Sequence, residues 1–200
     1  MSKRPISVIL LAAGTGSRMR GDKPLSLLHG QPLIRHALRL IEELPVQERI
    51  VVVGHQAEKL FPLLAGLPVW SIYNPDFLQG IGHSIAAGIR IASQQVEAYM
   101  VLLADMPLLR SEPIIAMMDA FLQSDESVWF MRPVFQGQPG HPVLFKARLH
   151  LTLSSLSGIH GAKEIIGSNP DKVRLFAWPD ATCLQDVDTP EDLEKITRLL

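Results

Sequence analysis

Short apolar segments alternate along this chain with amphipathic segments, and this alternation constrains the fold more than any other feature. Four such segments lie at residues 7–11, 49–53, 68–73 and 99–103. Continuous runs of this length are typical of strands covered on both faces, as in a parallel sheet. Between them, residues 32–43 and 83–95 repeat apolar side chains at helical spacing, and Ser111 is predicted to cap a third helix. The alternation predicts an α/β fold with a right-handed, doubly wound, mostly parallel sheet and helices on both faces.

The pattern changes after residue 123. Residues 127–133 and 142–145 are predicted strands on either side of a turn-rich segment, residues 136–140. Near the end of the sequence, Thr189 is the predicted cap of a last helix, with Pro190 at its first position. We see no internal repeat or linker, and we expect one domain over residues 1–200.

The composition is that of a globular protein: 47% of the residues are hydrophobic, and 19 Lys and Arg face 20 Asp and Glu. The formal charge of −1 argues against nucleic-acid binding through a broad basic face. No apolar run approaches the roughly 20 residues needed to span a bilayer, so no membrane association is expected. Cys183 is the single cysteine, which suits a reducing compartment, and we expect a structural thiol in a cytoplasmic protein.

Lys3 and Arg4, followed by the apolar residues 6–13, resemble a short signal peptide. The alternative is a buried first strand that leads directly into a loop. We favour the strand, because the next ten residues carry chemistry that cleavage would destroy.

The loop at residues 11–24, with the sequence LAAGTGSRMRGDKP, directly follows this first strand. Ligands of open α/β sheets bind outside the carboxyl ends of the strands, and glycines let backbone N–H groups approach phosphate oxygens. Arg18, Arg20 and Lys23 add three cations, so the loop is interpreted as a cradle for a polyphosphate. It is neither a P-loop, since Asp22 precedes Lys23, nor a dinucleotide fingerprint, since Met19 replaces the third glycine.

Two acidic sites accompany this loop. Asp105 follows the fourth apolar segment and precedes a Met-Pro turn. This is a suitable place for a carboxylate that binds Mg²⁺ together with phosphates. In the extended segment 186–190, we expect Asp186 and Asp188 to point to opposite faces, so that one of them shares a site with Asp105. Asp188 could instead cap the last helix. Two distant carboxylates and a cationic glycine loop, without a catalytic Ser/His/Asp or Cys/His set, suggest phosphoryl or nucleotidyl transfer.

Two further segments are expected to shape the pocket. Residues 74–84 run into a helix start whose glycines and polar side chains suit contact with a base, ribose or phosphate. Residues 136–142 could form an acceptor-side loop. His141 is its obvious polar group, although a lone histidine is more often structural than catalytic.

At this point the chain resembles a known family, the nucleotidyltransferases similar to molybdenum cofactor cytidylyltransferase and molybdopterin-guanine dinucleotide synthase. The resemblance runs from about Ile6 to the end of the sequence. Residues 105–107 resemble its metal-binding D-x-P motif, residues 137–142 the G-x-x-G-H-P loop of the cytidylyl branch, and residues 186–193 its terminal D-x-D-T-P-x-D-L. The opening motif L-x-A-G-x-S-x-R-M-G-x-x-K is matched by Leu11, Ala13, Gly14, Arg18, Met19 and Lys23.

The resemblance implies a Rossmann-like fold and Mg²⁺-dependent transfer of CMP from CTP to the terminal phosphate of the molybdopterin form of molybdenum cofactor, with release of pyrophosphate. It also implies a molybdoenzyme as a partner. The nucleotide would contact Leu11, Ala12, Ala13, Gly14, Arg18, Lys23, Gly80 and Ser84. The catalytic residues would be Lys23, Arg18 and Asp105, the Mg²⁺ ligands Asp105 and Asp188, and the acceptor-side residues Gly140, His141 and Pro142.

The chain also departs from the family. Gly16 stands at the serine of the opening motif and Arg20 at its later glycine. Residues 158–163 lack the acid of a G-D-x-G-A-R stretch and end in Lys163 instead of arginine, and lysine cannot form arginine's bidentate fork. The alternatives are therefore a nucleotidyltransferase with another base or a sugar-phosphate acceptor, a non-catalytic accessory protein that binds nucleotide or cofactor, and, third, a nicotinamide oxidoreductase.

Overall fold

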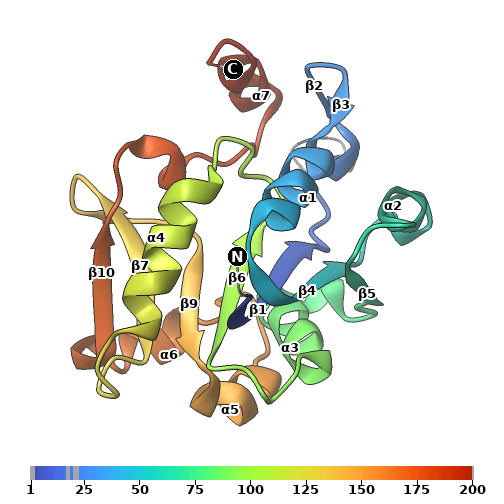
Figure 1. Cartoon of the computed structure of the whole chain (residues 1–200). Coiled ribbons are helices and arrows are strands. Elements are labelled where there is room, and N and C mark those ends of the chain that lie inside the picture. The colour runs from blue at the N-terminus through green and yellow to red at the C-terminus, as the bar shows by residue number, and fades with distance from the viewer. Residues whose placement is uncertain (1–2, 17–18, 20–22, 200) are drawn as a thin grey trace.

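The fold is built on a central eight-stranded sheet, which extends across Figure 1 from β10 to β5. It comes from a computed structural model that describes residues 3–16, 19 and 23–199. The strands of the sheet are β1 (Arg4–Ala12), β4 (Val46–Val53), β5 (Trp70–Tyr73), β6 (Ala98–Leu103), β7 (Phe130–Phe135), β8 (Gln138–Pro139), β9 (Val143–Lys146) and β10 (Val173–Ala177).

The strand order is β10-β7-β9-β6-β1-β4-β5, with β8 paired to β7. The pairs β1–β4, β1–β6, β4–β5 and β7–β10 are parallel, whereas β9 runs antiparallel to both of its neighbours. The predicted doubly wound, mostly parallel sheet is therefore confirmed. The segment that resembles a signal peptide is β1, an interior strand of the sheet, in which Ile6, Val8, Ile9 and Leu10 are fully buried.

Helices cover both faces of this sheet (Figure 1). One apolar layer packs the sheet against α1 (Leu33–Glu43), α2 (Ala57–Leu64) and α4 (Ser111–Leu122). The opposite layer packs it against α3 (Ile81–Ile91), α5 (His150–Ser154) and α6 (Lys163–Gly167). Alternate residues of β1 pack into the two layers, Leu10 into the first and Ile9 into the second, because successive side chains of a strand point to opposite faces.

The last helix, α7 (Pro190–Thr197), lies at one end of the molecule, as does the small hairpin of β2 (Leu27–Leu28) and β3 (Gln31–Pro32) (Figure 1). Ile196 of α7 belongs to a separate buried cluster with Leu28, Leu33 and Val187. This cluster joins the carboxyl-terminal segment to the part of the chain that follows β1.

Two details differ from the sequence-based predictions. The N-cap of α4 is Arg110, and Ser111 is the first helical residue without a side-chain cap bond. Strand β10 was not predicted, because its short sequence contains Arg174 and lacks a long apolar run. Its pairing with β7 was therefore not predicted either, and Arg174 and Leu175 are exposed. Thr189 and Pro190 do begin α7, as expected.

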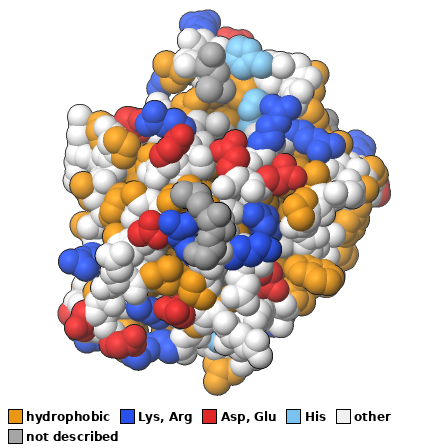
Figure 2. Space-filling view, in the orientation of Figure 1, with side chains coloured by type: hydrophobic (Ala, Val, Ile, Leu, Met, Phe, Trp, Pro, Cys, Tyr) orange, Lys and Arg blue, Asp and Glu red, His pale blue; other side chains and the backbone are white. Residues whose placement is uncertain are grey.

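The outer face of α1 and α4 mixes acidic and basic side chains with apolar ones (Figure 2). Within the described part of the chain, every helix is too short or too polar to cross a membrane.

Candidate active site

The turn after β1 and the turn after β6 lie side by side because these strands are parallel neighbours in the sheet. Leu11 of β1 is paired with Leu103 of β6, so both strands reach the same edge of the sheet. Just beyond, the backbone N–H of Ala104 donates to the carbonyl oxygen of Leu11 over 3.1 Å. Asp105 therefore follows directly beside the glycine turn.

Lys23 connects this turn to both predicted acidic sites. Its Nζ donates to Asp105 Oδ2 over 2.6 Å and to Asp188 Oδ1 over 2.7 Å. Burial of the ammonium acts to lower the pKa of Lys23, but the negative charges and hydrogen bonds of Asp105 and Asp188 outweigh it and raise the pKa above its usual value. Lys23 is thus a firmly charged cation between two carboxylates.

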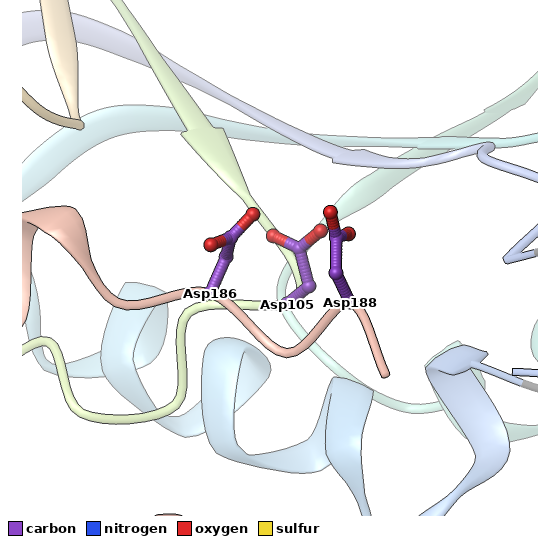
Figure 3. A group of neighbouring side chains, drawn as sticks. All are labelled: Asp105, Asp186 and Asp188. Carbon is purple, nitrogen blue, oxygen red and sulfur yellow. The ribbon is translucent and has the colours of Figure 1, made fainter. Parts of the chain in front are cut away.

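Asp186 belongs to the same group, and our expectation that Asp186 and Asp188 face opposite sides is wrong. Residues two apart in an extended segment share a face, and the residue that points away is Val187, which is fully buried. Figure 3 shows the carboxylates of Asp105, Asp186 and Asp188 in a row, all directed to the same side. Asp188 is not the cap of α7 either, since that role belongs to Thr189.

The three carboxylates fit a divalent cation. One oxygen of each lies within 4.8 Å of one oxygen of each of the others. Asp105 Oδ1 is buried and has no hydrogen-bond partner among the described residues, which fits an oxygen that binds a cation. Burial, followed by the charges of Asp105 and Asp188, raises the pKa of Asp186. Clustered carboxylate oxygens are ligands that Mg²⁺ and Mn²⁺ prefer.

A cleft of about 300 Å³ lies beside these groups. Of the predicted nucleotide contacts, Leu11, Ala12, Gly14 and Lys23 line it. Arg18 lies outside the described residues. The cleft is also lined by five residues that were not named as nucleotide contacts: Thr15, Gly16, Pro24, Leu33 and Ala104.

The structure explains why position 16 is a glycine, although the opening motif of the family has a serine there. Its φ is +54°, and a Cβ at this position would lie 2.4 Å from the Cβ of Lys23. The backbone of the turn therefore closes tightly against the residue that carries the central ammonium.

The other predicted nucleotide contacts, Ala13, Gly80 and Ser84, are not among the residues that line this cleft. Ala13 is buried, and its carbonyl oxygen accepts a 3.3 Å hydrogen bond from the backbone N–H of His55. Gly80, with a φ of +120°, packs against the backbone of Gly158, where a Cβ would meet a carbonyl oxygen at 2.4 Å. Ser84 is buried in α3 and its hydroxyl accepts a 3.0 Å hydrogen bond from Asn74. Contact of these three residues with a nucleotide stays a prediction.

The predicted acceptor-side residues adjoin a second cavity, also of about 300 Å³, which His141 lines. Gly140 approaches the carbonyl of Cys183 so closely that a Cβ would lie 2.0 Å from that oxygen. The backbone N–H of His141 donates to the same oxygen over 2.9 Å. Cys183 itself is a buried free thiol whose pKa is raised by burial, which fits a structural role.

Comparison with known proteins shows the family of the chain. Residues 8–173 match the MobA-like NTP transferase domain. Over 123 residues the chain is 32% identical to the bifunctional protein GlmU of Sphingopyxis alaskensis, a match that covers 60% of this chain and 27% of that protein. The chain thus spans about a quarter of the length of this relative.

Solved structures share the whole fold at low sequence identity. The crystal structure of Rv0371c from Mycobacterium tuberculosis H37Rv has a TM-score of 0.82 at 19% identity, and the match covers 96% of this chain and 98% of that one. Its manganese complex gives 0.79 at 18% identity, over 98% and 99% of the two chains. A CMP-2-keto-3-deoxy-manno-octonic acid synthetase complexed with CTP gives 0.76 at 15% identity, over 99% and 98%.

The family match extends over residues 8–173, which is most of the sequence, and the fold agrees with it. The chain belongs to the MobA-like NTP transferase domain family, which is a family of nucleotidyltransferase domains.

Proposed function

We propose that this protein is a Mg²⁺-dependent cytidylyltransferase that transfers CMP from CTP to the terminal phosphate of the molybdopterin form of molybdenum cofactor. The observation that carries the transfer chemistry is the contact of Lys23 with Asp105 and Asp188 beside the glycine turn. The choice of CTP and of this acceptor rests on the resemblance of residues 137–142 to the G-x-x-G-H-P loop. A protein of similar fold complexed with CTP supports the choice of nucleotide.

The proposed reaction is a single displacement at phosphorus. An oxygen of the acceptor's terminal phosphate forms a bond to the α-phosphorus of CTP, the bond from that phosphorus to the bridging oxygen breaks, and pyrophosphate leaves with the electron pair. A divalent ion held by Asp105 and Asp188 would supply positive charge next to the triphosphate. Lys23 neutralises the charge that develops on the phosphorus oxygens, and Arg18 is proposed to bind the triphosphate. The protein's contribution is orientation and charge neutralisation.

The direct test measures pyrophosphate release by the full chain with Mg²⁺, CTP and molybdenum cofactor, beside an active control enzyme. Pyrophosphate release that requires all three components is the expected result. No release with this acceptor, while a sugar phosphate or another NTP is turned over, would reject the proposed substrates and keep the chemistry. Nucleotide binding without any release would favour the accessory protein, and NADH binding without CTP binding would favour the oxidoreductase.

Asp105→Asn tests the metal role with little change of shape. We expect turnover to fall at least ~100-fold, because the amide keeps the volume but loses the charge that binds the cation. Asp171→Asn is the matched control, since Asp171 is an exposed carboxylate paired with its neighbour Lys172. Thermal unfolding of both variants should stay near that of the wild type, and a near-wild-type rate for Asp105→Asn would remove Asp105 from the metal site.

Thermal stabilisation separates the candidate bases, because a ligand that binds only the folded state raises its apparent stability. CTP with Mg²⁺ should raise the melting temperature more than GTP with Mg²⁺, and more than CTP alone. The proposed location is the cytoplasm, since a reducing compartment suits the free Cys183. A molybdoenzyme that accepts the product is the proposed partner.

A further inference from the structure

The second cavity lies across the end of β6 from the cleft that holds the carboxylates. Leu103, the last residue of β6, lines the second cavity, whereas Ala104 and Asp105 line the first. Two residues of chain span at most about 7 Å, so the two cavities flank the same turn. A ligand in the second cavity would therefore lie next to the carboxylate group.

The walls of this cavity are mainly apolar and belong to the layer that packs the sheet against α3, α5 and α6. The apolar lining comprises Ile81, Ile85, Val101, Leu103, Val143, Phe145, Ile159, Ala162 and Ile166. Ile81 and Ile159 are exposed large hydrophobic residues, so apolar surface continues to the mouth. A surface of this kind is typical of a small-molecule site that holds the body of an organic ligand.

The polar side chains of the cavity are all basic. They are Arg132, His141, His160 and Lys163, and within the described structure the lining contains no Asp or Glu. Lys163 and His160 are exposed at the mouth, whereas Arg132 and His141 are largely covered. A ligand with a negative charge is therefore favoured over a neutral or cationic one.

Arg132 has an unused donor inside this apolar environment. Its Nη2 donates to the carbonyl oxygens of Pro139 and Gly140, each over 3.2 Å, which ties one end of the guanidinium to the β7–β8 hairpin. Its Nε is buried and has no hydrogen-bond partner among the described residues. A buried charged donor without a partner is costly, and a ligand oxygen would satisfy it.

His141 offers a second unused atom. Its Nδ1 is also buried without a partner in the described part of the chain. Burial, followed by the positive charges of Arg132 and Lys163, lowers the pKa of His141 to about 4, so the ring is neutral near pH 7. A neutral ring adds a hydrogen bond to the site and leaves the charge recognition to the guanidinium.

We propose that the second cavity binds the acceptor substrate. In this proposal Arg132 binds an anionic group of the acceptor, and the apolar part of the acceptor packs between α3 and β9. The assignment of this ligand as the acceptor rests on the proposed function. The chemical class is a small organic anion, phosphate or carboxylate, joined to a ring or another apolar body. Lys163 at the mouth adds long-range attraction for the same charge.

The test uses simple probes on the full chain without nucleotide. Phenyl phosphate, benzoate, inorganic phosphate and benzyl alcohol are titrated, and methyl NMR signals of Val101, Val143 and Ile166 report the cavity. We expect phenyl phosphate or benzoate to shift these signals with a millimolar Kd, and the stronger of the two identifies the anion. Inorganic phosphate and benzyl alcohol, which each lack one half of the recognised chemistry, should bind at least ~10-fold more weakly.

Arg132→Gln should lower the affinity for the tighter-binding probe at least ~10-fold, whereas Arg132→Lys, which keeps the charge, should retain part of that affinity. The matched control is Arg148→Gln, because Arg148 is exposed and pairs with Glu126. In turnover assays Arg132→Gln should raise the acceptor KM and leave the Kd for CTP with Mg²⁺ unchanged. Folding of each variant is checked by its circular dichroism and melting temperature.

Two results would overturn the proposal. One is unchanged probe affinity in both Arg132 variants, and the other is that inorganic phosphate binds as tightly as phenyl phosphate. Failure of the proposed function is a different result: CTP with Mg²⁺ would not bind the wild type, although the organic anion would still shift the cavity signals and still depend on Arg132.

Discussion

His141 is a side chain whose protonation opposes folding. Its pKa falls from 6.5 to about 4 in the folded protein, so between these values the unfolded chain binds more protons than the folded one. The free energy of unfolding therefore has its full value above pH 6.5, where His141 is neutral in both states, and it decreases as the pH falls toward 4. Between pH 7 and pH 5 this loss is about 2 kcal/mol.

His141→Gln should remove that part of the pH dependence. Urea unfolding at pH 7 and pH 5 measures it: the wild type should lose about 2 kcal/mol more than the variant between the two pH values. His160→Gln, a change at an exposed histidine of the same cavity, is the control and should behave as the wild type does. Parallel pH curves for wild type and His141→Gln would contradict the argument.

At the scale of elements, helix α7 positions a ligand of the proposed metal site. A capping box begins it: the Thr189 hydroxyl accepts from the backbone N–H of Asp192, and Asp192 Oδ2 accepts from the backbone N–H of Thr189 over 2.8 Å. The same Asp192 oxygen accepts from the backbone N–H of Asp188 over 3.1 Å. The start of α7 thus fixes the backbone next to a carboxylate of the site.

Thr189→Ala should lower the free energy of unfolding by about 1 kcal/mol, with faster hydrogen exchange in α7. It should also weaken Mn²⁺ binding, measured by the paramagnetic relaxation of water, because Asp188 is less well placed. Thr197→Ala is the control, since the Thr197 hydroxyl bonds to Leu193 at the other end of the helix. An equal loss of Mn²⁺ affinity in both variants would show that the cap does not position Asp188.

At the scale of the whole molecule, the carboxyl-terminal segment packs closely against the residues that follow β8 and β6. Gly140 follows β8, its N–H donates to Pro133 over 2.9 Å, and its α-carbon approaches the carbonyl of Cys183. Three residues beyond Cys183 the segment reaches Asp186, and the N–H of Val187 donates to the carbonyl of Asp105 over 2.9 Å. The same short segment therefore contacts both the end of β8 and the proposed metal site.

Gly140→Ala should lower the free energy of unfolding by about 1–3 kcal/mol, because the Cβ meets backbone atoms that cannot rotate away. Gly167→Ala is the control, since a Cβ there has no neighbour within 4 Å among the described residues. It lies in α6, where alanine should be neutral or stabilising. Urea unfolding measures both, and equal stability of the two variants would show that the segment adjusts without cost.

Parts of the fold with a strong local signal were predictable. The apolar runs located β1, β4, β5 and β6, and the Thr-Pro pair located the start of α7. Strand β10 had no such signal, because it is half exposed and its pairing with β7 is decided by contacts across more than 40 residues of sequence. Asp186 could have been recognised from the sequence, since residues two apart in an extended segment share a face.

The sequence by itself determined the parallel sheet and the kinds of side chain at its carboxyl edge, because hydrophobic periodicity and turn chemistry act over a few residues. Only the tertiary structure decided which of these groups meet. The contacts of Lys23 with Asp105 and Asp188 join residues 82 and 165 positions apart. Arg132 and His141 likewise meet α3 and α6 around one cavity only after the sheet and its covering helices have packed. No local rule specifies such encounters, since they depend on the strand order and on how each layer is buried.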